Sequence, residues 1–248
     1  MFDPVEMAEL TRSIVCEKDR RKYYRFRPSR FYGGISTADS VGCCLRCVSC
    51  WSWNIVKDPG QHGKYYTPED VAGNLMGIAK KKNLAYLRIS RNEPTMHRTH
   101  LIRVLASINT KYSFILETNG ILIGNDPAYA EELSVFANLH VRVSLKGTCE
   151  EEFSSLTGAN PEGFALQLRA LENLRQYGIK VHPACMISFS HPENVKVLKK
   201  RLRAIDPTFE DFEVEELILY APVKERLKTL DIKYLSAYKP QKVPEKQI

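Results

Sequence analysis

The feature that most restricts the fold of this chain is an alternation of strand-type and helix-type segments between residues 31 and 230. Proline follows a capping residue at Thr67-Pro68, Asp126-Pro127 and Asn160-Pro161, and His191-Pro192 starts a further helix, since proline suits the first helical position. Short apolar segments lie between the helices. We expect strands at residues 31–39, 84–89, 112–116, 139–145, 179–187 and 216–220.

Six strands alternating with helices predict a parallel sheet covered by helices, the α/β class. Without an eightfold repeat, an open, partial (β/α)6 barrel fits better than a closed one. The chemistry of such folds lies at the C-terminal ends of the strands. We expect an N-terminal helix and basic segment over residues 1–30, a core domain over 31–230, and a C-terminal tail over 231–248, frayed from Tyr238.

A tight cluster of cysteines follows the first strand. Cys43, Cys47 and Cys50 have the spacing Cys-x3-Cys-x2-Cys, which lets one loop point three thiolates at one centre. Thiolates bind iron–sulfur clusters, zinc and cuprous ions. Structural zinc needs four ligands, usually in two pairs; no second pair follows, and Cys44 directly adjoins Cys43. Three cysteines leave one iron of a [4Fe–4S] cube open, which favours the cluster over zinc.

Charge and composition bound the partners. The 248 residues carry a net charge of +7, with basic and aromatic residues concentrated in Arg20–Arg30. An anionic partner, either RNA or an acidic electron-transfer protein, fits this charge. No apolar run reaches the ~18 residues of a membrane span, and the N-terminus does not resemble a secretion signal. We expect a cytoplasmic protein with reduced thiols and no membrane partner.

Polar clusters follow three of the later strands. Residues 90–95 include Glu93, a carboxylate that can bind an ammonium group. Residues 117–120 combine a carboxylate, a hydroxyl and an amide. Residues 144–150 include Lys146, which can meet a carboxylate. Because the ends of parallel strands share one edge of the sheet, these clusters and the cysteine loop predict one active site.

Together these motifs resemble the radical S-adenosylmethionine (SAM) superfamily, and within it the activating enzymes of glycyl-radical proteins such as pyruvate formate-lyase. The similarity covers about residues 31–227. Residues 90–94 stand where the family has Ser-Gly-Gly-Glu-Pro. Residues 116–120 resemble its Leu-Asp-Thr-Asn-Gly, and residues 144–146 resemble its Asp-Leu-Lys.

The resemblance implies that Cys43, Cys47 and Cys50 hold a [4Fe–4S] cluster. It also implies a radical SAM oxidoreductase that cleaves SAM reductively to a 5′-deoxyadenosyl radical, which abstracts hydrogen from a substrate. Reduced flavodoxin or ferredoxin would supply the electron. Glu93 would hold the SAM amino group, with Lys146 near its carboxylate. The residues expected to bind SAM are Trp51, Ser90, Asn92, Glu93, Glu117, Thr118, Ser144 and Lys146.

The chain departs from the family pattern at several positions. Arg91 and Asn92 replace the Gly-Gly pair, so we do not expect glycine-type backbone angles there. Ser49 replaces an aromatic residue near adenine, so Trp51 or Trp53 would supply the stacking face instead. Ser144 stands where the activating enzymes carry Asp, and Ala221 stands where they carry His. These two differences weaken the expectation that the substrate is a glycyl-radical enzyme.

Alternatives for the substrate and for Cys149 stay open at this stage. A protein or peptide substrate fits the activating-enzyme resemblance. RNA is the second candidate, with Arg20–Arg30 binding phosphates and Tyr23 and Tyr24 stacking on bases. A third interpretation is a metal-binding protein without catalysis. Cys149 is either a catalytic hydrogen-atom donor at the mouth of the site or a loop cysteine without a role.

Overall fold

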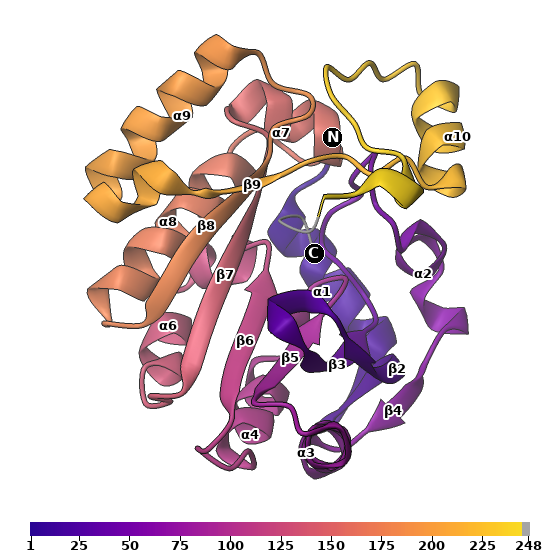
Figure 1. The fold of residues 1–248 in the computed structure, drawn as a ribbon, viewed down its shortest axis with the longest axis vertical. Helices are drawn as coiled ribbons and strands as arrows, with labels where there is room; N and C mark the ends of the chain where they lie inside the picture. The colour runs from indigo at the N-terminus through magenta and orange to yellow at the C-terminus, as the bar shows by residue number, and fades with distance from the viewer. Residues whose placement is uncertain (245–248) are drawn as a thin grey trace.

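A computed structural model describes residues 1–244, and these residues form one nine-stranded sheet covered by helices (Figure 1). The strand order is β1-β2-β3-β5-β6-β7-β8-β9, and β4 pairs with β2. The strands are β1 (Cys16–Glu17), β2 (Arg20–Ser29), β3 (Ile35–Ser40), β4 (Lys64–Tyr66), β5 (Tyr86–Ser90), β6 (Ser113–Thr118), β7 (Leu139–Lys146), β8 (Lys180–Met186) and β9 (Glu213–Glu215).

The six strands from β3 to β9 in this order are all parallel, which confirms the predicted open α/β partial barrel. Strands β1, β2 and β4 extend the β3 edge in antiparallel pairings. The residue-30 boundary expected between the N-terminal segment and the core falls in the connection between β2 and β3. That division stays a prediction, although β2 joins the sheet of the core.

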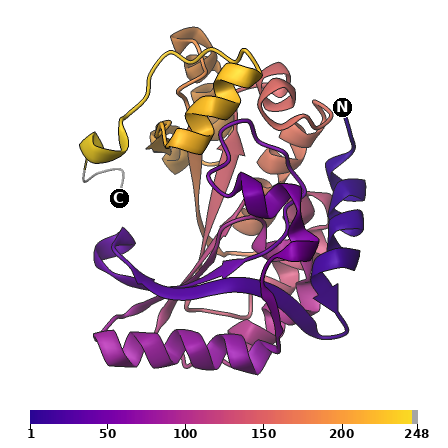
Figure 2. The same ribbon diagram turned by 90° about the vertical axis from the view of Figure 1, so that its right-hand side faces the viewer.

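Helices cover the outer face of the sheet. In Figure 2, α3 lies beneath the sheet and α10 lies above α2. Thr67 opens α3 as expected, since Thr67 and Asp70 cap each other's backbone N–H groups at 3.2 Å. The helices are α1 (Pro4–Val15), α2 (Trp53–Lys57), α3 (Pro68–Lys82), α4 (Arg98–Ala106), α5 (Ile121–Asn125), α6 (Pro127–Leu133), α7 (Glu150–Thr157), α8 (Gly163–Gln176), α9 (Pro192–Ile205) and α10 (Ala221–Thr229).

Alternation along the strands gives the sheet two different faces, and β7 shows this most clearly. Its odd-numbered residues are apolar, buried, and packed in the main core with residues of α8. Its even-numbered residues are polar and line the inside of the partial barrel. The apolar set is Leu139, Val141, Val143 and Leu145, and the polar set is His140, Arg142, Ser144 and Lys146.

The last strand differs from the expectation. We expected it at residues 216–220, but β9 ends at Glu215. The chain then leaves the sheet: Leu217 is buried, and Ile218 forms an isolated bridge with Tyr238. The Tyr238 hydroxyl donates to Glu216 at 2.6 Å, so the tail is not frayed there. Residues 245–248 of the expected frayed tail lie outside the described residues.

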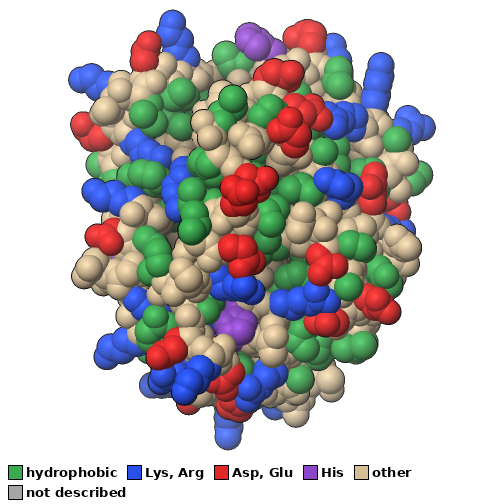
Figure 3. Space-filling view, turned by 180° about the vertical axis from the view of Figure 1, so that it is seen from behind, with side chains coloured by type: hydrophobic (Ala, Val, Ile, Leu, Met, Phe, Trp, Pro, Cys, Tyr) green, Lys and Arg blue, Asp and Glu red, His purple; other side chains and the backbone are tan. Residues whose placement is uncertain are grey.

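The side of the molecule seen in Figure 3 is not dominated by charge of one sign. Basic and acidic side chains are interspersed over the side of the molecule that Figure 3 shows. The helices found between residues 1 and 244 are all too short or too polar to cross a membrane.

Candidate active site

A cavity of about 500 Å³ lies at the C-terminal ends of the parallel strands. All three cysteines of the expected cluster line it, and so do most of the residues expected to bind SAM. Two predicted site residues, Glu93 and Cys149, do not line it. The cavity thus brings together Cys43, Cys47, Cys50, Trp51, Ser90, Asn92, Glu117, Thr118, Ser144 and Lys146.

Backbone contacts fix the cysteine loop in place. Gly42 begins it with φ of +91°, and a Cβ there would lie 2.9 Å from Val15 of α1. The Arg46 N–H donates to the carbonyl oxygen of Thr157, at the end of α7, at 3.1 Å. The Val48 N–H donates to the carbonyl of Leu156 at 2.8 Å. The loop is therefore held from two sides, by α1 and by α7.

Burial affects the protonation of all three thiols. Burial raises the pKa of Cys47 to about 12 and also raises the pKa of Cys50. The pKa of Cys43 is raised by a hydrogen bond with Cys44 and by burial. The thiols therefore hold their protons while the site is empty of metal, and a cluster that binds there must displace those protons.

The arrangement of the donors also fits a cube. Among residues 1–244, no three His, Cys, Asp or Glu side chains converge on a point that one metal ion could occupy. A cube needs no such point, because each cysteine binds a different iron. Cys44 is fully buried in the core, where the Asn119 side chain donates to its sulfur at 3.2 Å. Cys44 is therefore not a fourth ligand.

Three side chains hold the carboxylate of Glu117 in the cavity wall. Arg88 Nη1 donates to it at 2.7 Å, Ser90 Oγ at 2.6 Å, and the Tyr32 hydroxyl at 3.3 Å. Burial alone would raise the pKa of Glu117, but the charges of Arg88 and Arg142 outweigh it and lower the pKa. Glu117 is therefore an ionised, fixed acceptor in the cavity wall.

Lys146, at the end of β7, directs its positively charged side chain toward the cysteines. Its Nζ donates to Ser144 Oγ at 2.5 Å, and Ser144 Oγ donates to Glu215 at 3.1 Å. Its charge lies close enough to oppose the rise in the pKa of Cys47. Lys146 and Ser144 therefore act together, as one polar group beside the cluster position.

Glu93 binds other residues of the chain through its carboxylate. Its side chain is fully buried, and one carboxylate oxygen accepts from the Thr95 hydroxyl and the Thr118 hydroxyl, both at 2.6 Å. The other oxygen accepts from the Asn119 N–H at 2.8 Å. The carboxylate is saturated because it joins the 90–95 loop to the end of β6. Glu93 does not line the cavity, and its expected contact with the SAM amino group stays a prediction.

The backbone at Arg91 and Asn92 corrects an expectation. Both residues have positive φ, +63° and +51°, although neither is glycine. This conformation costs roughly 1–2 kcal/mol for an ordinary residue and less for Asn. Hydrogen bonds hold it: the Asn92 side chain donates to the Ser40 carbonyl at 2.6 Å, and Ser40 Oγ donates to the Arg91 carbonyl at 2.8 Å. The loop keeps a glycine-like course without glycine.

Trp51 lines the cavity, whereas Trp53 does not. The Trp51 side chain is 39% exposed, and its ring meets Tyr220 edge-on with centroids 5.3 Å apart. Cys149 precedes α7 outside the cavity, and burial raises its pKa. This placement favours the interpretation of Cys149 as a loop cysteine without a role.

Sequence reasoning missed the charged residues on the barrel's inner face. Arg142, almost fully buried, donates to Glu213 at 2.8 Å and to Glu215 at 2.6 Å. Arg88 similarly meets Glu117. The sequence did contain a signal for these inner-face charges, since Arg88 and Arg142 each stand between apolar residues of a strand. The missed residues that line the cavity are Arg27, Tyr32, Arg88, Arg142, Glu213 and Glu215.

The N-terminal half of the basic segment is structural. Arg21 is fully buried and donates to the Glu93 carbonyl at 2.6 Å. Tyr23 is 1% exposed, and its hydroxyl lies 3.1 Å from His100 Nε2. The prediction that Tyr23 stacks on a base is therefore wrong.

Several of the remaining basic side chains of Arg20–Arg30 form ion pairs with acidic residues of the chain. Arg25 and Arg27 both donate to Asp39 of β3, at 2.7 and 2.9 Å. Arg20 pairs with Glu17 at 2.5 Å. These contacts reduce the positive charge available for a nucleic acid.

Fold and site together define an α/β protein that presents a three-cysteine cluster loop at the ends of parallel strands. The sequence model of the Radical SAM superfamily matches residues 38–204, and the chain belongs to this superfamily. The cofactors of the superfamily are a [4Fe–4S] cluster and SAM, and the cysteines for the cluster are present.

Several known proteins are similar to this chain. A probable GTP 3',8-cyclase of Pyrobaculum aerophilum is 28% identical over 140 residues, 56% of this chain and 43% of that protein. Streptococcus suis SuiB, solved with its precursor peptide SuiA, has a TM-score of 0.58 and 18% identity over 72% of this chain and 38% of that one.

A further solved structure is anSMEcpe with bound AdoMet and the Cp18Cys peptide. Its TM-score is 0.55 and its identity 19%, over 74% of this chain and 49% of that one. This chain therefore spans less than half the length of each of the three relatives. The two solved structures are similar in fold.

Proposed function

We propose that this protein cleaves SAM reductively and uses the resulting radical to take a hydrogen atom from a polypeptide substrate. The observation that carries the proposal is the convergence of Cys43, Cys47 and Cys50 with the polar ends of β5, β6 and β7 in one cavity. Bound together, the cluster and SAM supply one-electron cleavage of the sulfonium carbon–sulfur bond. The protein supplies binding, orientation and exclusion of water.

The SAM amino group fits Asn92 better than Glu93. Asn92 lines the cavity, and its Oδ1 is buried without a hydrogen-bond partner in the described part of the chain. An unpaired buried acceptor is costly, and an ammonium group would satisfy it. We assign Lys146 to the SAM carboxylate and the Trp51 ring to the adenine, because both line the cavity, whereas the Thr118 hydroxyl already donates to Glu93.

The chemistry is tested by anaerobic reconstitution. We expect about four irons and four sulfides per chain, an EPR signal that SAM perturbs, and 5′-deoxyadenosine after addition of SAM and dithionite. Cys47→Ala should abolish the EPR signal and product formation. Cys16→Ala is the matched control, because Cys16 lies outside the cavity, at the end of α1. Stoichiometric zinc without a SAM effect would refute the proposal and favour a non-catalytic metal site.

A polypeptide is the substrate class we favour. The cavity is lined by Phe31 and Tyr32 from one edge of the barrel and by Glu216 and Ile218 from the other, a mixture that suits a peptide loop. SuiB and anSMEcpe, which share the fold, were solved with peptides. Likeness to glycyl-radical activating enzymes, the oxidoreductase class, the electron donor and the cytoplasmic location remain proposals.

Three substrate classes can be compared in one assay. The reduced enzyme is mixed with SAM that carries deuterium at the 5′-methylene. A peptide pool, GTP or tRNA is then added in separate reactions. We expect faster 5′-deoxyadenosine formation and deuterium exchange with peptides only. Stimulation by GTP, the substrate named for the Pyrobaculum relative, would exclude the peptide proposal, and so would salt-sensitive stimulation by tRNA.

A further inference from the structure

Helix α10 packs directly on the cysteine loop. Its residues Val223 and Leu227 form one apolar cluster with Val48 of the loop. Figure 2 shows α10 lying above the segment that contains the loop and α2. A polar residue on the same side of α10 is therefore brought close to the cluster position.

Arg226 is that residue, and two contacts hold it. Its guanidinium lies over the Trp53 ring, 3.3 Å from the ring centroid. Its Nη2 donates to the carbonyl oxygen of Arg46, within the cysteine loop, at 3.1 Å. Stacking and hydrogen bond together fix the plane of the guanidinium.

The other terminal nitrogen of Arg226 has no partner. Nη1 is buried and makes no hydrogen bond within residues 1–244. A buried charged donor without an acceptor is strongly unfavourable. Arg46, whose carbonyl oxygen accepts from Nη2, directly precedes Cys47 in the chain. The unpaired nitrogen therefore belongs to a guanidinium that is held against the cysteine loop.

Arg226 approaches the cysteines from outside the cavity. It is not among the residues that line the cavity, whereas Lys146 is. Lys146 is also bonded to Ser144. The two cations therefore approach the cysteine loop from different sides, Lys146 from within the cavity and Arg226 from outside it.

We propose that Arg226 is a positioning residue for the cluster, which donates from Nη1 to a cluster or thiolate sulfur and stabilises the reduced state. The proposal rests on the cluster of the proposed function. Reduction adds one electron to the cluster, and a nearby cation favours the added negative charge. The electron comes from an external one-electron donor. Without this cation, the cluster becomes harder to reduce.

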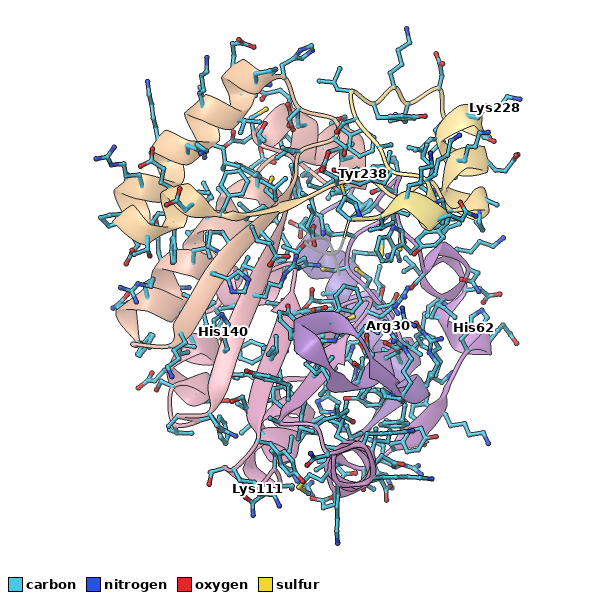
Figure 4. The ribbon with its side chains drawn as sticks, viewed as in Figure 1. Arg30, His62, Lys111, His140, Lys228 and Tyr238 are labelled. Carbon is cyan, nitrogen blue, oxygen red and sulfur yellow. The ribbon has the colours of Figure 1, made fainter. Side chains whose placement is uncertain are left out.

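The test is a potentiometric titration of the reconstituted protein without SAM, followed by EPR of the reduced cluster. Arg226→Gln should shift the midpoint potential to a more negative value. Arg226→Lys, which keeps the charge, should lie between that value and the wild type. Lys228→Gln is the matched control, because Lys228 lies on the same helix but points to solvent (Figure 4), and its potential should match the wild type.

An unchanged or less negative potential in Arg226→Gln would overturn the proposal, and so would an equal shift in Lys228→Gln. If Arg226→Gln does not hold a cluster but Arg226→Lys does, the charge is required at the cluster and the proposal stands. If both fail to bind iron while circular dichroism shows a native fold, the proposal is refuted. The titration needs no SAM, so its result is separate from the outcome of the cleavage assay.

Discussion

At the scale of single residues, Glu93 occupies a motif position expected to bind the cofactor, but in this structure its side chain stabilises the fold. Four donors from two loops converge on its carboxylate. The buried guanidinium of Arg21 donates to its backbone carbonyl. This network lies under the cavity and fixes the ends of β5 and β6, which carry Ser90 and Thr118.

Glu93→Gln should destabilise the fold. The amide places an N–H₂ group against groups that are themselves donors, so at least one buried donor loses its acceptor. We expect a loss of about 1–3 kcal/mol in the free energy of unfolding, measured by urea titration of the reconstituted protein. Glu172→Gln, at an exposed position of α8, is the control and should be neutral. Equal stability of the two variants would contradict the network.

The role of Glu93 could not be predicted from the sequence. The motif placed a carboxylate near the site correctly, but its direction depends on donors from residues 118 and 119, which are distant in the chain. The same limit applies to Asn92, whose left-handed backbone was not expected. Spacing predicted which loops meet, and tertiary hydrogen bonds decided which side chains enter the cavity.

At the scale of elements, the regular strands and helices were predictable, whereas the short ones were not. Strong periodicity and proline caps identified α3, α9 and the strands β5 to β8. The last strand was predicted too late in the chain, because the apolar residues 217–219 do not join the sheet: Ile218 forms an isolated bridge, and Leu217 and Leu219 pack in the cluster with α10. Helix α5 was missed because five residues give too little periodicity.

Two glycines in different helices should respond to alanine in opposite ways. In α5, a Cβ on Gly124 would lie 1.8 Å from the Leu166 carbonyl oxygen of α8, so Gly124→Ala must push the helices apart. We expect a loss of about 1–3 kcal/mol. In α3, Gly73 has no neighbour within 4 Å, and Gly73→Ala should stabilise by about 0.4–1 kcal/mol. Thermal unfolding measures both, and shifts of the same sign would contradict this packing.

At the scale of the whole molecule, the free energy of unfolding should decrease as the pH is lowered, in two separate pH ranges. Burial lowers the pKa of His100 from 6.5 to about 4. The unfolded chain takes up this proton first, so stability falls as pH drops from about 6.5 to 4, by roughly 3 kcal/mol in all. Arg142 and His182 overcome the effect of burial and lower the pKa of Glu213 to about 2, so its contribution is lost between pH 4.5 and 2.

Urea titrations between pH 7.5 and 5 test the upper pH range. His100→Gln should flatten the decline, because no imidazole remains to take up the proton. His191→Gln, exposed at the start of α9, should keep the slope of the wild type. An unchanged slope in His100→Gln would mean that another group is responsible.

The paired charges inside the barrel have a consequence for how such a protein can diversify. Arg142 is shared by Glu213 and Glu215, and Arg88 is matched by Glu117. Loss of Glu117 leaves the buried charge of Arg88 without this partner, and loss of Arg142 leaves two neighbouring carboxylates without their cation, and either change is far more damaging than loss of a whole charge group. A lineage that alters the charge of this cavity must therefore change two positions in concert. New substrate preferences then arise in discrete jumps, each separated from the next by a poorly folding intermediate sequence.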